Sequence, residues 1–410
     1  MPTRKLIVLD TSFSFEAIES RGLKNSVTCR DLDGYFEHVW SVHPFASLVT
    51  SNKWGKKFGL HVTYLVNAKH TFIEGKVGVS NIFRIIPPLN FVLSQSLFLF
   101  FLIRLIKREK IDIVRVGDAL YLGLLGIILK KFTGIKLVVR VGANNQKIRE
   151  VTGKLIMPRL FRSEKQERLI EHFVLSRADL VAGANKENIQ FAINSGANPD
   201  KCTIFRYGNL IDPAHFLPPS QRATTDESFA RTPFLLCIAR LEPIKKVDDV
   251  IRVLAEVKKC GFDVKVLLVG EGSERDNLTH LADQLGVLND VVFCGNRDQQ
   301  WLASLIPRAK VIISPHTGRA LTEAALAAAP IAAYDVDWQA ELIETGVTGE
   351  LVTFGDWKAL AISTIKLLRE RAYALSVGDK VRSRALEMMD PNKLNCHEKF
   401  EYEKLLISKL

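Results

Sequence analysis

The sequence predicts an α/β protein with two doubly wound, Rossmann-like domains that face each other across a cleft. Short apolar runs alternate with helical patterns from residue 111 onward, which is typical of parallel sheets covered by helices. A segment rich in proline, serine and threonine, residues 212–231, divides this alternation into two halves. A chain of 410 residues is long enough for two or three domains, each with its own core.

These patterns predict the domain boundaries. We expect an N-terminal domain over residues 1–212, a linker over residues 213–233 and a C-terminal domain over residues 234–390. Residues 391–410 have a helical composition, and we expect them to pack back on the N-terminal domain.

In the N-terminal half, residues 10–52 are irregular and rich in aromatic and polar side chains, which predicts long loops and short helices. Apolar runs predict strands at residues 5–9, 61–66, 82–86, 113–116, 136–141, 180–182 and 203–206. Helical patterns cover residues 91–110, 121–131 and 163–176.

The helix predicted over residues 91–110 has an unusual composition. Its core, residues 97–103, is apolar on all sides, and Arg104, Lys107, Arg108 and Lys110 follow directly. The apolar run is shorter than the roughly 20 residues that a membrane-spanning helix needs. We expect a helix buried against the sheet, and a basic helix on an anionic membrane surface is the alternative.

The net charge of +11 concerns partners rather than fold. It suits an anionic membrane surface or a polyanionic acceptor, and the sequence has no arginine-rich tail, zinc spacing or aromatic RNA-binding pattern that would predict nucleic-acid binding. The six cysteines lack C-x-x-C spacing and are expected to be reduced. The N-terminal apolar run is too short for a signal peptide, so we expect a cytoplasmic protein. A peripheral location on the inner face of the membrane is the alternative that a membrane-surface helix would imply.

In the second half, strands are predicted at residues 234–239, 264–269, 291–294, 311–314 and 331–334. Ser273 and Asp276 have the spacing of a capping box at the start of a helix. An alanine-dense helix follows the strand at residues 311–314 and a short loop at residues 315–318. A helix that begins just past the carboxyl end of a strand is an anion site in a parallel sheet.

Two residues near the start of this helix support a ligand site. Gly318 lets a ligand approach the backbone, and Glu323, over one turn into the helix, can accept hydrogen bonds from sugar hydroxyls. An ordinary strand–helix repeat with small residues for tight packing is the alternative. Arg240 and Lys245 follow the first strand of this half and suit a diphosphate, although a solvated basic turn has the same composition. Gly270 lies in a second glycine loop, which alone is a weak signal.

Two further groups of side chains could bind a metal ion or transfer a proton. Asp335 and Asp337 look like a metal-binding carboxylate pair, but no third ligand is evident, so we expect no metal. His43, beside Trp40 and Pro44, is either an acid–base or acceptor-binding group or a structural histidine.

In combination these elements carry a family resemblance. Arg240-x4-Lys245, Leu268-Val269-Gly270-Glu271-Gly272, Phe293-Cys294-Gly295, Glu323-Ala324 and Glu341-Leu342-Ile343 resemble, in this order, the retaining family 4 glycosyltransferases of the GT-B fold. The resemblance covers most of residues 111–352. It implies that Arg240 and Lys245 hold the nucleotide-sugar diphosphate as catalytic residues.

The resemblance also assigns the other site residues. The donor-binding set would be Gly270, Asn296 and Arg297 near the base, Thr317, Gly318 and Arg319 near the sugar or phosphate, and Glu323 on the ribose hydroxyls. Candidates on the acceptor side are His43, Arg115, Asp118, Asn144 and Asn145.

The sequence departs from the family at several of its motif positions. Pro315 takes the place of the first of two paired glutamates, and Gly142 stands where many members have a histidine. Ala239 and Lys246 replace glycines that flank the phosphate-binding pair. These changes predict a divergent subfamily, with a catalytically silent one as the alternative.

The expected function is transfer of a sugar, with retention, from a UDP- or GDP-sugar to a glycan or lipid-linked acceptor in cell-envelope polysaccharide biosynthesis. Arg240 and Lys245 would stabilise the departing diphosphate, so neither a cofactor nor a metal is expected. A sugar-nucleotide epimerase of the same fold and a silent glycan-binding protein are the alternatives.

Overall fold

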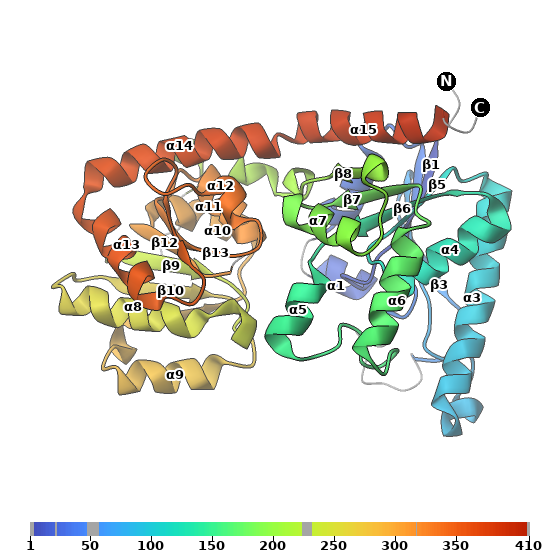
Figure 1. The fold of residues 1–410 in the computed structure, drawn as a ribbon, viewed down its shortest axis with the longest axis horizontal. Helices are drawn as coiled ribbons and strands as arrows, with labels where there is room; N and C mark the ends of the chain where they lie inside the picture. Colours follow the sequence, from blue (N-terminus) through green and yellow to red (C-terminus); the bar gives the residue numbers. More distant parts are fainter. Residues whose placement is uncertain (1–3, 21–22, 47–56, 224–231, 317, 408–410) are drawn as a thin grey trace. The chain divides into compact units, whose positions relative to one another are not determined.

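The computed structural model describes residues 4–20, 23–46, 57–223, 232–316 and 318–407. The chain divides into two compact units (Figure 1), the first comprising Met1–Leu210 with Asn392–Leu410 and the second Ile211–Pro391. Each unit is a largely parallel sheet with helices on both faces, an arrangement that buries the strands on two sides and explains their apolar sequences.

The first unit contains an eight-stranded sheet in the order β3-β4-β2-β1-β5-β6-β7-β8, in which only β3 runs antiparallel to its neighbour. Its strands are β1 Lys5–Leu9, β2 His38–His43, β3 Val62–Asn67, β4 His70–Glu74, β5 Ile113–Val116, β6 Lys136–Val141, β7 Leu180–Gly183 and β8 Cys202–Ile204. Its helices are α1 Phe15–Ser20, α2 Asn25–Thr28, α3 Pro87–Glu109, α4 Tyr121–Thr133, α5 Asn145–Thr152, α6 Glu164–Leu175, α7 Lys186–Asn194 and α15 Pro391–Ile407.

Two predictions for this half were wrong, and one strand was missed. The irregular stretch at residues 10–52 contains the buried central strand β2, and β4 was not predicted at all. The strand predicted at residues 82–86 is instead a 3-10 turn, η4 Asn81–Ile85, in which the Ser80 hydroxyl accepts a hydrogen bond from the Ile82 N–H. The turn leads directly into α3, which begins with two prolines that a helix tolerates at its first positions.

Helix α15 covers one face of the first sheet. Tyr402 and Leu405 of this helix are buried in a cluster with Phe36 and Phe205. On the other face, α3, α4, α6 and α7 enclose the larger core of the unit. The last helix of the described chain therefore completes the first unit.

The second unit contains a six-stranded, fully parallel sheet in the order β11-β10-β9-β12-β13-β14. Its strands are β9 Phe234–Ile238, β10 Lys265–Val269, β11 Val291–Gly295, β12 Val311–Ser314, β13 Ile331–Asp335 and β14 Glu350–Thr353. Its helices are α8 Val247–Lys259, α9 Arg275–Gln284, α10 Gln299–Leu305, α11 Arg319–Leu326, α12 Gln339–Leu342, α13 Trp357–Arg369 and α14 Arg371–Met389. The residues of the predicted linker that are described, 213–223 and 232–233, lie in this unit.

Two interior clusters show how the helices cover the second sheet. Helices α8, α9 and α13 bury their apolar stripes on one face, whereas α10, α11 and α12 bury theirs on the other. Helix α14 contributes to both clusters. The capping box predicted at Ser273 is absent, because the Ser273 hydroxyl donates a hydrogen bond to Glu242 and α9 begins two residues later.

Helix α3 is buried on one face only. Asn90, Gln95, Phe98 and Leu102 are among its buried residues, while Leu89, Val92, Leu97 and Phe100 are exposed. The prediction of a helix buried against the sheet is therefore right for one face and wrong for the other.

Candidate functional site

The second sheet has a topological switch point between β9 and β12. These strands are paired, yet the connection after β9 leads through α8 to β10 on one side, and the connection after β12 leads through α11 to β13 on the other. The two connections run over opposite faces, which leaves room between the first residues of both loops. The sequence places Arg240 and Lys245 in the first loop and Gly318 at the start of α11 in the second.

Arg240 and Lys245 lie in an environment poor in compensating charge. Arg240 is exposed, and Lys245 ends the 3-10 turn η10 Pro243–Lys245. Burial and the nearby Arg240 guanidinium lower the pKa of Lys245, and only Asp337 opposes them. Two cations that repel each other at a strand's carboxyl end are stabilised when an anion binds between them.

Helix α11 begins at the same switch point. Gly318 has φ +66° at the N-cap position, and a Cβ built there would meet no atom within 4 Å, so the space beside it is open. Arg319 is exposed at the first position of the helix. Thr317 lies outside the described residues. The N-terminus of α11 therefore begins beside open space, next to the Arg240–Lys245 loop.

Glu323 is only 6% exposed, one turn into α11. Burial raises the pKa of its carboxyl group to about 7, an effect that Asp212 reinforces and Arg319 opposes. A buried carboxylate of this kind is costly when nothing binds it, and hydrogen bonds donated by ligand hydroxyls would lower that cost.

Gly270 lies where two loops approach each other closely. A Cβ at Gly270 would lie 2.0 Å from the Ala239 carbonyl oxygen, and one at Gly272 would lie 2.2 Å from the Leu241 oxygen. The loop after β10 is hydrogen-bonded to the loop after β9 through Leu241 and Glu271. Both glycines thus let these loops touch, and the contact fixes the backbone around Arg240.

Lys246 has a left-handed backbone, with φ 52° and ψ 38°. This conformation costs an L-residue energy and is the usual reason for a glycine. Lys246 therefore stands in a backbone conformation that suits glycine.

Asn296 and Arg297 follow β11, two strands away from the switch point on the β10 side, and both are exposed. The Arg297 guanidinium donates a hydrogen bond of 2.9 Å to the Cys294 carbonyl and lies 4.9 Å from the centre of the Trp301 ring. This arrangement makes a flat, cationic surface at the strand end.

Sequence reasoning missed His316, which links three loops of the switch point. Its Nδ1 lies 3.4 Å from the Ile244 carbonyl oxygen, and its Nε2 lies 3.9 Å from the Asp337 carboxylate. The loops after β9, β12 and β13 therefore meet at this side chain. Its position directly behind a strand and a proline was the available signal.

Two buried side chains hold these loops in place. Gln339 donates hydrogen bonds to the carbonyls of Ser314 and Tyr334 and accepts one from the Ser314 hydroxyl. The Tyr334 hydroxyl donates a 2.8 Å hydrogen bond to Asp249 in the first turn of α8. Both interactions join strand ends to neighbouring elements, so the Arg240–Lys245 loop and the start of α11 have rigid supports.

The first unit has its own switch point, between β1 and β5. Asp10 follows β1, Asp118 follows β5 and His43 ends the adjacent strand β2, so the three lie at the carboxyl edge of neighbouring strands. Burial raises the pKa of Asp118 to about 6, and its Oδ1 accepts hydrogen bonds from the N–H groups of Leu120 and Leu122. Asp118 therefore caps α4 at this edge.

His43 is fully buried, and its Nδ1 accepts a 3.3 Å hydrogen bond from the N–H of Phe45. Burial lowers its pKa to about 4, so the ring is neutral near pH 7. Burial would raise the pKa of Asp10, but the Arg30 guanidinium, 2.6 Å away, and hydrogen bonds from Ser12 hold it below its usual value.

The side chain of Arg115 binds α15, so its place on the acceptor side stays a prediction. Its guanidinium donates hydrogen bonds to Glu398 (2.7 Å) and to the Tyr402 hydroxyl (3.3 Å), both on α15. Its side chain leaves β5 toward the face that α15 covers. Arg115 therefore fastens the last helix to the sheet.

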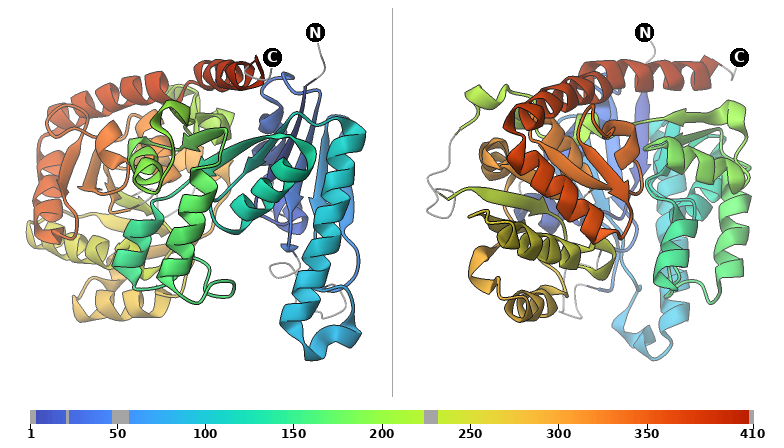
Figure 2. Two further views of the ribbon diagram at one scale, coloured as in Figure 1. Left: turned by 45° about the vertical axis from the view of Figure 1, so that its right-hand side comes forward. Right: turned by 60° about the vertical axis from the view of Figure 1, so that its left-hand side comes forward.

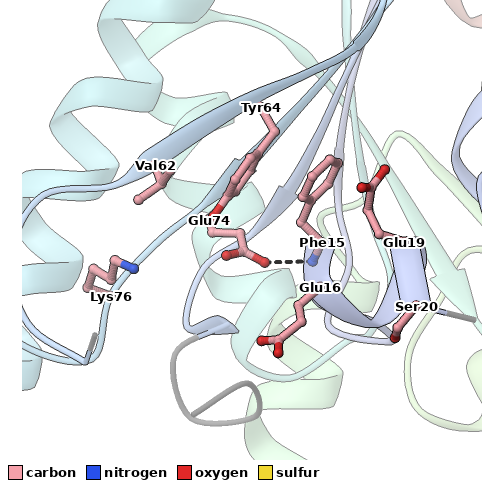
Figure 3. Close-up of a pocket in the computed structure, with 8 residues that line it drawn as sticks. All are labelled: Phe15, Glu16, Glu19, Ser20, Val62, Tyr64, Glu74 and Lys76. Carbon is pink, nitrogen blue, oxygen red and sulfur yellow. Dashed lines mark hydrogen bonds between the residues drawn. The ribbon is translucent and has the colours of Figure 1, made fainter. Parts of the chain in front are cut away.

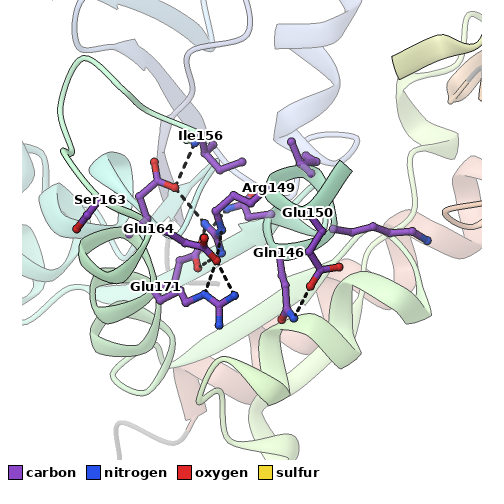
Figure 4. Close-up of polar contacts among 12 residues, drawn as sticks. Gln146, Arg149, Glu150, Ile156, Ser163, Glu164 and Glu171 are labelled. Atoms are coloured by element: carbon purple, nitrogen blue, oxygen red, sulfur yellow. Dashed lines mark hydrogen bonds and ion pairs between the residues drawn. The ribbon is translucent and has the colours of Figure 1, made fainter. Parts of the chain in front are cut away.

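Asn144 and Asn145 lie at the carboxyl end of β6, where both serve local structure. Asn144 caps α5 by accepting from the Lys147 N–H, and Asn145 donates a 2.8 Å hydrogen bond to Glu171. Figure 4 shows the buried Arg149 beside them, paired with Glu171 at 2.8 Å. This network fixes the start of α5 against α6.

A hollow of about 770 Å³ lies at the same edge, beside the end of β4. Phe15 and Tyr64 stack along its wall with ring centres 4.2 Å apart, and Glu16, Glu74 and Lys76 also line it (Figure 3). Glu74 accepts a 2.7 Å hydrogen bond from the Phe15 N–H, and burial raises the pKa of its carboxyl group. An aromatic platform next to carboxylates can hold a polyhydroxylated ring.

The described residues contain no group of three or more histidine, cysteine, aspartate or glutamate side chains placed to hold a metal ion. Asp335 is exposed at the end of β13 and Asp337 lies near His316 and Lys245.

Part of this chain matches a known protein family. Residues 224–384 match the model of the family described as glycosyl transferases group 1. These residues therefore form a group 1 glycosyltransferase domain. The matched residues include the whole switch point of the second unit, from Arg240 to Glu323.

The chain is only distantly similar in sequence to its relatives. It is 22% identical over 313 residues to N-acetyl-alpha-D-glucosaminyl L-malate synthase of Bacillus anthracis, which covers 75% of this chain and 77% of the relative. It is 32% identical over 133 residues to phosphatidyl-myo-inositol mannosyltransferase of Mycobacterium leprae, or 31% of this chain and 35% of the relative. The second match therefore spans only about a third of either protein.

Solved structures agree with the fold over the whole chain. A sucrose-phosphate synthase from Thermosynechococcus elongatus has a TM-score of 0.74 at 15% identity and covers 99% of this chain and 100% of its own. Anabaena Alr3699/HepE in complex with UDP has a TM-score of 0.70 at 17% identity, with 98% and 100% covered. The chain therefore has the GT-B fold, as the sequence predicted.

Proposed function

We propose that this group 1 glycosyltransferase moves a sugar from a nucleoside diphosphate donor, a UDP- or GDP-sugar, to a glycan or lipid-linked acceptor of the cell envelope. The second unit binds the donor and the first unit binds the acceptor. The HepE structures contain UDP or UDP-glucose, and a mycobacterial relative is described as GDP-mannose-dependent, which supports this donor class. A phosphatidyl-myo-inositol mannosyltransferase among the relatives supports a lipid-linked acceptor.

One observation carries the proposal. Arg240 and Lys245 lie in the loop next to the N-terminus of α11, and burial together with the Arg240 guanidinium lowers the pKa of Lys245. Two cations beside a helix N-terminus at a switch point suit a diphosphate. Glu323, one turn further along α11, then meets the ribose hydroxyls.

The same charges favour a reaction that retains the anomeric configuration. The bond between the anomeric carbon and the β-phosphate oxygen breaks, the acceptor oxygen bonds to that carbon, and the acceptor's proton passes to the departing phosphate oxygen. Arg240 and Lys245 stabilise the charge that develops on the diphosphate, as a metal ion does in other transferases. On this basis we propose metal-independent transfer.

An inverting reaction would need a base opposite the leaving group. Asp118 is occupied in capping α4, and the neutral His43 ring is buried with a backbone N–H on its Nδ1. We assign both of them to acceptor positioning at the edge of the first unit.

A two-stage experiment tests the function. A panel of nucleotide sugars is first screened for the one that raises the melting temperature, because a ligand of the folded state stabilises it. Transfer from that donor to lipid-linked and soluble glycans is then followed by NMR, with the donor's anomeric configuration expected in the product. An inverted product would refute retention. Conversion of the donor sugar to its epimer without an acceptor would show an epimerase instead.

A further inference from the structure

An exposed apolar stripe runs along η4 and the first turns of α3. Its side chains recur every three to four residues, which places them on one face, and Figure 2 shows this end of α3 extending past the sheet of its own unit. Exposure reaches 89% at Ile85 and 52% at Leu97. The stripe comprises Ile82, Ile85, Ile86, Leu89, Val92, Leu93, Leu97 and Phe100.

The opposite face of α3 is fixed to the first unit by buried hydrogen bonds. Gln95 donates to the carbonyls of Pro44 (3.1 Å) and Lys76 (3.0 Å) and accepts from the Tyr121 hydroxyl (2.8 Å). Asn90 accepts from the Val79 N–H at 2.7 Å. Among the described helices, α3 is the one with the length and composition to cross a membrane. Crossing would break these bonds and leave their groups unpaired.

The charged side chains of the segment that contains the stripe are all cationic. No aspartate or glutamate occurs between Glu74 and Glu109, whereas five cations do: Lys76, Arg84, Arg104, Lys107 and Arg108. Arg104 and Lys107 are exposed and continue the spacing of the stripe, and the Arg104 guanidinium lies 4.3 Å from the centre of the Phe100 ring. The exposed face of α3 is therefore apolar for about four turns and then basic.

We propose that η4 and α3 form a docking surface for an anionic lipid bilayer. The stripe enters the boundary between headgroups and acyl chains, and Arg104 and Lys107 contact the lipid phosphates, as in a helix that lies in the membrane plane. A second copy of the chain fits this surface less well. A two-fold contact sets the same patch against itself, and two cationic segments without acidic partners repel each other.

Flotation with lipid vesicles tests the docking surface without any nucleotide sugar, so its outcome is independent of the proposed transferase activity. The protein is mixed with vesicles of phosphatidylcholine alone or of phosphatidylcholine and phosphatidylglycerol in equal parts. We expect it to float with the anionic vesicles and to be partly released by salt, because salt screens the headgroup attraction.

Substitutions separate the apolar and the electrostatic contributions. The variant Leu89→Gln/Leu93→Gln/Leu97→Gln should bind anionic vesicles about a hundredfold less well, since three leucine side chains no longer enter the bilayer. Arg104→Gln/Lys107→Gln should lose about tenfold, because each lost cation weakens attraction to anionic lipid.

The control is Ile362→Gln/Leu375→Gln, which removes two apolar side chains with exposures of 69% and 55% in the second unit. It should bind vesicles like the wild type, and circular dichroism should show every variant folded. Two results would overturn the proposal. One is a triple leucine variant that floats like the wild type. The other is a wild type that ignores vesicles and elutes as a dimer that the triple variant cannot form.

Discussion

Arg115 Nη1 donates a hydrogen bond of 2.7 Å to Glu398 Oε1, although 283 positions separate the two residues in the sequence. The pair is buried between β5 and α15, where it also contacts the Tyr402 hydroxyl. An ion pair of this kind is costly to break from one side, because the remaining charge is left unpaired in the interior.

We therefore expect Arg115→Met to lower the free energy of unfolding by about 3 kcal/mol. Chemical denaturation measures the loss, and KM for the acceptor should not change in the protein that remains folded. Removing both charges, in Arg115→Met/Glu398→Met, should restore most of the stability. A variant with normal stability and a raised acceptor KM would return Arg115 to the acceptor site.

Arg240→Gln and Lys245→Gln should each lower kcat by about a hundredfold or more, because each removes a cation that stabilises the departing diphosphate. The matched control is Lys310→Gln, since Lys310 is exposed and directly precedes β12, at the edge of the sheet away from the site. Steady-state rates with saturating donor make the comparison. Wild-type turnover in either site variant would contradict the diphosphate assignment.

The raised pKa of Glu323 predicts opposite effects of pH on the free energy of unfolding and on donor binding. Its pKa rises from an ordinary 4.5 to about 7 on folding, so the folded state binds the extra proton between these values. The free energy of unfolding should therefore fall by about 3 kcal/mol as pH rises through this window, and be lowest above pH 7.

The variant Glu323→Gln should remove that loss and be more stable than the wild type at alkaline pH, yet equal to it at acid pH. It should also bind nucleoside diphosphate weakly at every pH, whereas wild-type binding weakens as the pH falls below 7. Thermal melts and calorimetric titration at several pH values test both statements. Glu387→Gln, the same change at an exposed position of α14, should alter neither.

Gly270 and Gly318 should respond differently to alanine. At Gly270 a Cβ would lie 2.0 Å from a backbone oxygen, so Gly270→Ala should destabilise the second unit by more than about 3 kcal/mol. Gly318→Ala meets open space, but the methyl group strains a backbone with φ +66° and ψ −126°, which costs about 1–3 kcal/mol. Donor affinity of the folded Gly318→Ala protein should nevertheless fall, because the methyl group occupies the space in front of α11. Unchanged affinity would mean that the ligand lies elsewhere.

Transfer should survive chelation. Activity in excess EDTA should equal that of the untreated enzyme if Arg240 and Lys245 supply the charge that a metal would otherwise provide. A loss that manganese or magnesium restores would refute the metal-independent mechanism.

The sequence predicted the second unit better than the first for a physical reason. Strands buried on both faces need continuous apolar runs, and β9, β10 and β12 have them. Strand β2 reads His-Val-Trp-Ser-Val-His, and its polar side chains are accommodated by partners that no local pattern shows, such as Arg30 for Ser41.

The candidate site, too, could be predicted only in part. Residues that follow strands, such as Arg240 and Glu323, could be placed from local order alone. The roles of His316, Gln339 and Arg115 depend on contacts between loops and helices far apart in the sequence, so a single sequence gave no means of assigning them.

Helix α15 has a consequence for the order in which the protein is made. The first unit needs Tyr402 and Glu398 to cover its sheet and to neutralise Arg115, and both residues are synthesised after the entire second unit. The unit that the ribosome starts first is thus the one that it finishes last. While the second unit is being synthesised, the part of the first sheet that Tyr402 and Leu405 cover is still exposed, and we expect chaperones to bind the nascent chain there.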